Sequence, residues 1–319
     1  MQQALLTGSL QAVSVVTNCW LQSIRFYVQA LGYQIRYEGM LNNAQRKAFG
    51  EHLGRYALLG HTQGSLVRLL ETSLTDAMPN RMGARPWDLG MAVIEAGTTD
   101  IDKTYYRVLR NRFGAISEPA EFDVEGPEPL GMVVMKSAAF IGPAGEQLFV
   151  TQIVRRKGGV SLLKESAVEG VNAPANIVIS MKDRSPIENF WQPVLGISPV
   201  NDLPLKQPLV AKIMAGPPDM GFDMLLMGHG THRIGMEQHV YAPYNPSYDY
   251  HIFACSFEKT GIASACWQSA DLALAAQKIT AAGYEIISRV GLPIRNKQTP
   301  EAVVFRGPLG EIIELIALR

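Results

Sequence analysis

The sequence predicts an α+β protein built from four similar units, each with one strand, one helix and about three further strands. The first observation is repetition: FIGPAGEQLFVTQI (140–153) and FRGPLGEIIELIAL (305–318) share a Phe, a Gly-Pro turn, a Gly-Glu pair and an apolar strand. The second is that short apolar runs alternate with amphipathic stretches, which indicates strands alternating with helices. The chain therefore consists of two similar halves.

Three further pairs of segments support the two halves. They are FYVQALGY (26–33) with FWQPVLGI (190–197), LLGHTQGSLVRLLE (58–71) with LLMGHGTHRIGME (225–237), and PWDLGMAVIE (86–95) with SYDYHIFACS (247–256). The offsets between partners run from 161 to 166 residues. We therefore expect domains at 1–155 and 172–319, a linker at 156–171, and four units at 8–75, 85–155, 172–242 and 247–319.

Local patterns predict the elements within a unit. AVSVV (12–16) and NIVIS (176–180) are typical opening strands, and an amphipathic stretch with a Leu-Gly turn follows each of them. The second unit of each half has its own helix candidate, DIDKTYYRVLR (100–110) and DLALAAQKITAAG (271–283). Gly283 is a typical helix C-terminus.

Composition excludes some classes of partner. With 29 basic and 29 acidic residues among 319, the chain has no net charge and no cluster of Lys and Arg that would follow phosphates, so we expect no nucleic-acid partner. The hydrophobic content is 47% without a run of 18 apolar residues, and the start lacks a signal sequence. We expect a cytoplasmic protein without a membrane partner, whose three scattered cysteines are buried thiols.

Glu314 lies in the middle of the apolar strand that closes the chain. A carboxylate withdrawn from water costs several kcal/mol unless a cation or strong donors meet it. The partner could be a metal ion, or it could be Arg306 or Arg319 at a strand end.

In combination, the F-[YW]-x-x-x-L-G and closing G-P-x-G-E-x-[IL]-x segments resemble those of the vicinal oxygen chelate superfamily. This superfamily includes glyoxalases, extradiol ring-cleaving dioxygenases, epimerases and drug-resistance proteins, and the resemblance covers nearly the whole chain. It implies βαβββ modules, two of which curl into one cup, so that four modules form two cup-shaped mixed-sheet domains. The two-domain size also resembles the extradiol dioxygenases, which implies an empty N-terminal cup and a metal in the C-terminal cup.

The resemblance implies metal ligands on the first and last strand of each module in a cup. Carried over to this chain, these positions are Ala12, Glu71, Gly90 and Phe149 in the first half and Asn176, Glu237, His251 and Glu314 in the second half. We therefore expect His251, Glu314 and Glu237 to bind one divalent ion per chain, which could be Fe²⁺, Mn²⁺, Zn²⁺, Ni²⁺ or Co²⁺. Asn176 is a poor ligand, so it would act through water or bind the substrate. Glu237 could instead be structural, because Glu71 is retained in a half without other ligands.

Histidine and tyrosine side chains gather near these positions. On a strand, Glu237, His239 and Tyr241 share a face, so we expect His239 to be an acid/base and Tyr241 to line the cup. An exposed histidine at a strand end is the alternative for His239. The run YAPYNPSYDY (241–250) would form a rim that contacts the substrate. From this run we expect Tyr241 and Tyr250 in the catalytic group with His239, and Tyr244 and Tyr248 at the substrate.

Two reaction classes and one binding role are open at this point. A metal that chelates vicinal oxygens of a small oxygenated or aromatic substrate could stabilise an enediolate, as in an isomerase, epimerase or lyase of the glyoxalase type. It could instead hold a catechol beside O₂ for extradiol ring cleavage. A metal-free binding or resistance protein is the third hypothesis. The ligand set favours the first class, and the sequence leaves a homo-oligomer open.

Overall fold

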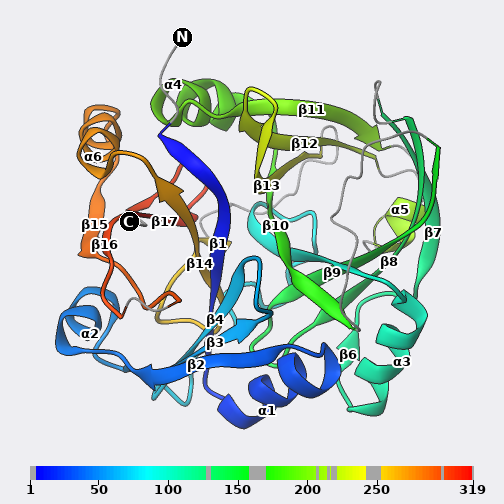
Figure 1. The fold of residues 1–319 in the computed structure, drawn as a ribbon, viewed down its shortest axis with the longest axis horizontal. Helices are drawn as coiled ribbons and strands as arrows, with labels where there is room; N and C mark the ends of the chain where they lie inside the picture. The colour runs from blue at the N-terminus through cyan, green and yellow to red at the C-terminus, as the bar shows by residue number, and fades with distance from the viewer. Residues whose placement is uncertain are drawn as a thin grey trace.

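The structure, a computed structural model, consists of two curled sheets that lie side by side with short helices around them (Figure 1). It describes residues 5–126, 131–157, 170–205, 208–213, 216, 221–241, 253–295 and 298–317. No helix among these residues is long and apolar enough to cross a membrane.

The first sheet has eight strands in the order β15-β16-β17-β14-β1-β4-β3-β2. It joins the first and the fourth module of the chain. Its strands are β1 (Leu6–Thr17), β2 (Gln34–Met40), β3 (Leu53–Gly60), β4 (Leu66–Thr72), β14 (Gly261–Ser269), β15 (Ile286–Val290), β16 (Glu301–Arg306) and β17 (Ile312–Ile316).

The second sheet joins the second and the third module in the order β11-β12-β13-β10-β5-β9-β8-β6, and β7 also pairs with β8. Its strands are β5 (Gly90–Thr98), β6 (Gly114–Ala115), β7 (Ala120–Gly126), β8 (Gly131–Ile141), β9 (Gln147–Lys157), β10 (Val171–Met181), β11 (Ser198–Leu205), β12 (Phe222–His229) and β13 (His232–Val240). The four-module fold class predicted from the sequence is confirmed.

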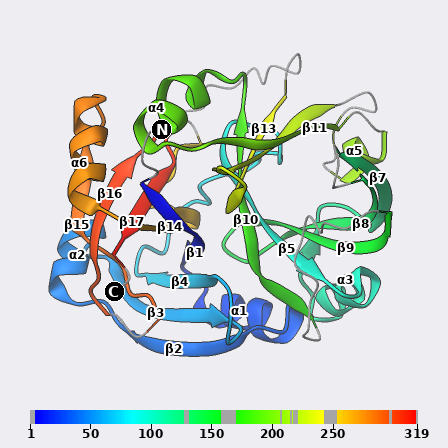
Figure 2. The ribbon, with the colours of Figure 1, turned by 45° about the horizontal axis from the view of Figure 1, so that its top comes forward.

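The helices cover the outer faces of the sheets, with α2 and α6 beside the first sheet and α3 beside the second (Figures 1 and 2). Their bounds are α1 (Trp20–Arg25), the π-helical η1 (Phe26–Ala30), α2 (Asn43–Phe49), α3 (Ile101–Arg110), the π-helical η2 (Ile187–Trp191), α4 (Gln192–Leu195), α5 (Pro208–Ile213) and α6 (Leu272–Ala281). The π-helical turn η1 lies within the first F-[YW]-x-x-x-L-G segment, whereas η2 overlaps the second segment only at Phe190 and Trp191.

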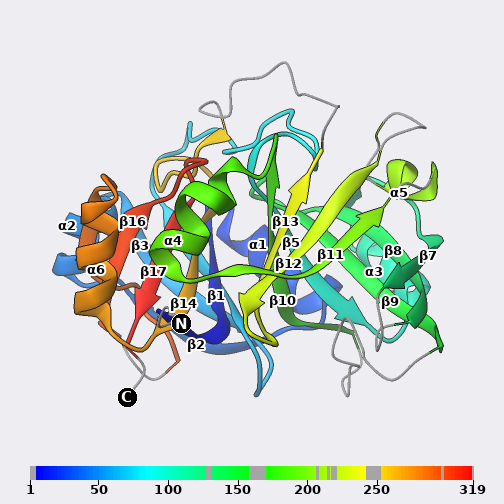
Figure 3. The same ribbon diagram turned by 90° about the horizontal axis from the view of Figure 1, so that it is seen from above.

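The expectation of two consecutive domains is wrong, because the sheets do not pair neighbouring modules within each half of the chain. β1 runs antiparallel to β14, and β5 runs antiparallel to β10. Each sheet therefore takes one module from each half of the sequence. Internal sequence similarity identifies the modules, but it does not predict which modules share a sheet. Any two of the similar opening strands offer similar backbone edges for pairing. Figure 3 shows the resulting division, with β1, β14 and β17 on one side and β5, β8 and β9 on the other.

The opening strand of the fourth module also lies later in the chain than predicted. The sequence comparison placed it at 247–256, whereas β14 begins at Gly261. Gly90 and Gly261 each open their strand with a positive φ, 105° and 99°. Each glycine stands ten residues before the aspartate that caps the next helix, Asp100 for α3 and Asp271 for α6. This spacing identifies β5 and β14 as the matching strands.

Two apolar clusters support this arrangement. The larger one contains side chains of both sheets and of the helices around them, for example Val15 of β1, Ile177 of β10 and Ile279 of α6. The smaller one belongs to the second sheet and contains Phe149 and Phe222. Among the described residues, the apolar side chains of the first sheet belong to the larger cluster.

Candidate functional site

The strand register shows which residues of the two sheets correspond. In each sheet the two opening strands run antiparallel, and each is flanked by the last strand of its own module in parallel. Matching the residues that lie opposite one another gives four pairs, first sheet then second: Ala12 with Asn176, Arg68 with Glu237, Cys266 with Glu95, and Glu314 with Phe149.

Two of these four correspondences agree with the sequence comparison and two correct it. The pairs of Ala12 with Asn176 and of Phe149 with Glu314 are those expected. The match of Glu71 with Glu237 is wrong, because Arg68 occupies that position. Glu71 is partly exposed and binds Arg55 at 3.1 Å. The match of Gly90 with His251 is wrong because of the shifted strand.

The first sheet surrounds a polar centre that we call the closed cup. Arg68 is fully buried, and its guanidinium binds the Glu314 carboxylate, which is also buried. Nη2, the nitrogen that binds Glu314, also donates to Ser14 Oγ at 2.8 Å, and Nε donates to the same oxygen at 3.0 Å. The partner of Glu314 is therefore Arg68, and neither Arg306 nor a metal ion is needed to explain its burial.

Backbone fills the rest of the closed cup. Pro293 accepts a hydrogen bond from Arg68 Nη1 at 3.2 Å, and the Leu292 N–H donates to Glu314 Oε1 at 2.8 Å. Leu292 and Ile294 are fully buried. Gln45 of α2 holds this segment by donating to the Gly291 carbonyl at 2.9 Å. The closed cup thus has an internal ion pair and an internal plug in place of a ligand.

The predicted metal site of Glu237, His251 and Glu314 is not assembled. Glu237 lies on β13 of the second sheet, while Glu314 lies on β17 of the first sheet and is bound by Arg68. His251, Tyr244, Tyr248 and Tyr250 lie outside the described residues. We expected the N-terminal cup to differ from the C-terminal cup. The two cups do differ in their buried charges, but each cup is a sheet that contains one module from each half of the chain.

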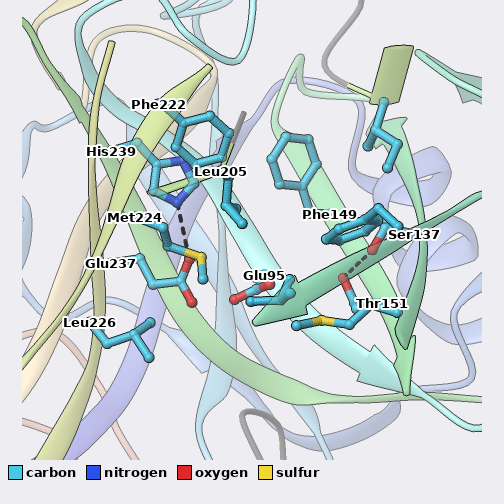
Figure 4. Close-up of a pocket in the computed structure, with 14 residues that line it drawn as sticks. Glu95, Ser137, Phe149, Thr151, Leu205, Phe222, Met224, Leu226, Glu237 and His239 are labelled. Carbon is cyan, nitrogen blue, oxygen red and sulfur yellow. Dashed lines mark hydrogen bonds and ion pairs between the residues drawn. The ribbon is translucent and has the colours of Figure 1, made fainter. Parts of the chain in front are cut away.

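The second sheet forms an open cup with a pocket of about 650 Å³, a volume that includes the part continuous with solvent (Figure 4). Side chains from β5, β7, β8, β9, β11, α5, β12 and β13 line it. Nine of the fourteen lining residues that the structure describes are apolar, and none of these fourteen is Lys or Arg. An apolar wall with few polar groups is typical of a small-molecule site.

Two carboxyl groups meet at the polar end of this pocket. Glu95 and Glu237 point toward each other in Figure 4. Asn176 Nδ2 lies between them and donates to Glu95 Oε2 at 2.6 Å and to Glu237 Oε1 at 2.8 Å. The register explains the meeting, since Asn176 lies directly opposite Glu95 and two residues from the position beside Glu237. The sequence comparison missed Glu95, although its distance from Gly90 marks it as the counterpart of Cys266.

Burial raises the pKa of both carboxyl groups. For Glu95, loss of water is the largest cause and the nearby Glu237 is the second, and together they raise its pKa well above the ordinary value. Burial also raises the pKa of Glu237, while a hydrogen bond from Glu95 and the charge of Arg233 oppose the rise. The stronger rise at Glu95 favours the proton of the pair on Glu95 and the negative charge on Glu237.

A histidine and a tyrosine extend this network, as the shared strand face predicted. His239 Nε2 lies 3.1 Å from Glu237 Oε2, and His239 Nδ1 lies 3.1 Å from the Tyr241 hydroxyl. Burial lowers the pKa of His239 to about 3, so the imidazole is neutral. If Nε2–H donates to the Glu237 carboxylate, Nδ1 accepts from the Tyr241 hydroxyl, and both nitrogens of the His239 ring have a partner. His239 is buried, so the exposed alternative is wrong.

The hydrogen bonds of the cluster decide whether it fits a divalent ion. A cation shared by Glu95 and Glu237 would occupy the space into which Asn176 now directs its two N–H groups. Among the described residues, no three His, Cys, Asp or Glu side chains are arranged to hold a metal. The fourth position of the open cup is Phe149, which offers no ligand. As arranged, these side chains fit a shared proton and do not fit a metal ion.

The chain has the fold of solved glyoxalase structures, which agrees with the fold that the sequence motifs indicated. The chain is similar to glyoxalase I from Zea mays, with a TM-score of 0.61 and 14% identity over 98% of this chain and 92% of that one. It is also similar to a dioxygenase candidate from Bacillus subtilis, with a TM-score of 0.58 and 12% identity over 98% and 86% of the two chains. No family model and no curated protein sequence matches the chain. At these identities the likeness shows the fold alone.

Proposed function

We propose that the chain is an enzyme of the glyoxalase type that moves a proton next to a carbonyl group, as an isomerase, epimerase or lyase does. The observation that supports this proposal is the buried pair of Glu95 and Glu237, which holds one proton at the polar end of an apolar pocket. Two interacting carboxyl groups with raised pKa values suit general acid and general base roles near neutral pH.

The proton inventory of the pair is sufficient for the reaction. The Glu237 carboxylate takes the proton from the carbon beside the substrate carbonyl. The protonated Glu95 gives its proton to the carbonyl oxygen, so a neutral enediol forms. Return of a proton to the other face or the other carbon gives the product, and the pair returns to its starting state. No oxidant is consumed.

His239 and Asn176 position the two acids. His239 Nε2 holds the Oε2 atom of Glu237. Asn176 donates to the Oε1 atom of Glu237 and also to Glu95, so it fixes both carboxyl groups. Tyr241 is buried behind His239 and holds its Nδ1, which agrees with a supporting role for this residue. These contacts support His239 as a positioning residue.

Hydrogen exchange provides the test. 2-Hydroxy-1-tetralone, an α-hydroxyketone with an apolar body, is incubated with the protein in D₂O, and loss of the C2 hydrogen is followed by proton NMR. We expect exchange above the buffer rate, and a loss of about 100-fold or more in Glu237→Gln, because a positioned acid or base contributes about 10²–10⁴-fold. Glu71→Gln is the matched control and should exchange at the parent rate. Exchange that is no faster than in buffer, or equal in Glu237→Gln, contradicts the proposal.

A divalent ion, which the side chains as arranged do not fit, is the other way to balance the pair, with the Glu95 and Glu237 carboxylates as hard donors. It would require the Asn176 amide to turn its oxygen inward. Elemental analysis of protein purified without chelator tests this candidate, with one equivalent per chain as the supporting result. Oxygen uptake with a catechol by the iron-loaded protein would instead favour ring cleavage. Ligand binding without exchange or oxygen uptake would favour the binding-protein hypothesis.

A further inference from the structure

The walls of the open cup restrict the charge of its ligand. The described lining residues include two carboxyl groups and no Lys or Arg. A ligand that brought its own carboxylate or phosphate into this pocket would lose water and meet the negative charge on Glu237 without a cation in contact. The charge of Arg233 acts on Glu237, but Arg233 is half-buried and is not among the lining residues of the pocket.

Aromatic and aliphatic side chains form the middle of the pocket. Phe122, Phe149 and Phe222 contribute flat faces from three different strands, and Met135 and Met224 add adaptable contacts. Such walls bind a rigid ring system well, because burial of its apolar faces is favourable and few rotamers must be fixed. Met side chains fill the remaining gaps around such a body.

A second polar spot lies across the pocket from His239 and Glu237. Ser137 of β8 and Thr151 of β9 are both buried and hydrogen-bond each other through their hydroxyls at 2.7 Å (Figure 4). One hydroxyl donates to the other, so the accepting hydroxyl keeps its own hydrogen for a ligand. Thr151 stands two residues beyond Phe149, which lies beside Glu95, so the backbones of Glu95 and Thr151 are about 8 Å apart along the sheet.

We propose that the open cup binds an uncharged ring compound with an oxygen function at each end. One oxygen lies at Glu95 and Glu237, the other lies at Ser137 and Thr151, and the ring body lies between the phenylalanine side chains. This inference deepens the proposed function, because it names the substrate class of the same site. A substrate of this class differs from one that carries a carboxylate or phosphate group into the pocket.

Three naphthalene probes test the ligand class by isothermal titration calorimetry at pH 7. They are 2,6-dihydroxynaphthalene with two neutral oxygens, 2-naphthol with one, and 6-hydroxy-2-naphthoate with a carboxylate. We expect the diol to bind tightest, 2-naphthol about 5-fold more weakly for the loss of one hydrogen bond, and the naphthoate at least about 10-fold more weakly than the diol. Naphthoate affinity equal to that of the diol, or no binding of the diol below millimolar concentration, overturns the inference.

Two variants assign the effects to the two ends. Ser137→Ala combined with Thr151→Val should make the diol and 2-naphthol bind equally, because the second polar spot is lost and the volume is nearly kept. Glu237→Gln should reduce the discrimination against the naphthoate, because the negative charge is removed. Unchanged ratios in both variants also overturn the inference, provided that circular dichroism shows the parent fold.

Equilibrium binding separates this inference from the proposed function. Binding of the diol in the expected order without any hydrogen exchange would remove the proposed reaction and keep the ligand class. Exchange of the tetralone without the expected order would keep the reaction and overturn the ligand class.

Discussion

The closed cup and the open cup have the same strands in the same register, and they differ in how their buried charges are balanced. In the closed cup Arg68 and Glu314 neutralise each other, and residues 291–294 fill the space around them. In the open cup Glu237 corresponds to Arg68 and Phe149 corresponds to Glu314, so the second acid, Glu95, has a proton in place of a cation. The two cups thus differ at all four matched positions, and among the described residues only the closed cup balances its buried carboxylate with a basic side chain.

The largest expected effect comes from breaking the balance of the closed cup. Arg68→Met should lower the free energy of unfolding by about 3–5 kcal/mol, because it leaves the Glu314 carboxylate buried without its cation. Urea denaturation measures this change. The double variant Arg68→Met with Glu314→Leu should recover most of the loss, since no charge then remains. A single variant as stable as the parent would mean that the ion pair contributes nothing.

The next effect concerns the two glutamates of the Gly-Pro-x-Gly-Glu turns, one in each sheet. Burial raises the pKa of Glu146 and of Glu311 to about 7. The native state therefore keeps protons that the unfolded chain releases near pH 4.5. The stability from each protonated carboxyl is complete below about pH 4.5 and is lost as the pH rises through about 7, by up to about 3 kcal/mol per group.

Urea denaturation between pH 4 and 8 measures this loss in the parent and in two variants. Glu146→Gln and Glu311→Gln should each flatten the pH dependence, because the amide does not titrate. Glu146 also accepts from the Tyr27 hydroxyl at 2.8 Å, so Tyr27→Phe should steepen the dependence that Glu146 causes. The same slope in parent and in both Gln variants would show that these carboxyl groups titrate normally in the fold.

A smaller effect is expected behind the open cup. Tyr241→Phe should lower the free energy of unfolding by about 1–3 kcal/mol, because it leaves His239 Nδ1 buried without a donor. It should also change the pH profile of hydrogen exchange, since His239 would no longer be held against Glu237. A purely structural tyrosine would change stability and leave that profile as in the parent.

The smallest effect is expected at the surface. Glu71→Gln removes the partly exposed pair with Arg55, for which we expect a loss below about 1 kcal/mol in the free energy of unfolding. This variant sharpens the comparison, because a glutamate on the same strand as Arg68 should matter little once it is exposed. A loss as large as that of Arg68→Met would remove the distinction between buried and exposed pairs.

The sequence predicted the modules well and their partners poorly. The Gly-Pro-x-Gly-Glu turns and the helices at 101–110 and 272–281 could be located because turn and cap chemistry is local. The shared face of Glu237, His239 and Tyr241 also followed from the period of a strand. The contact of Arg68 with Glu314 spans 246 residues, and no local pattern records it. Glu95 was missed because the matching strand was placed too early.

The pairing of the first module with the last has a consequence for how the chain is made. During synthesis, β1 emerges from the ribosome long before β14, its antiparallel neighbour in the first sheet. The second and third modules can pair as soon as the third module has emerged. The first module must therefore wait, with Arg68 lacking its carboxylate, until the final strand arrives. We expect the open cup to form first during synthesis and the closed cup to form last, so truncation of the last strand should trap a chain whose N-terminal module has no partner.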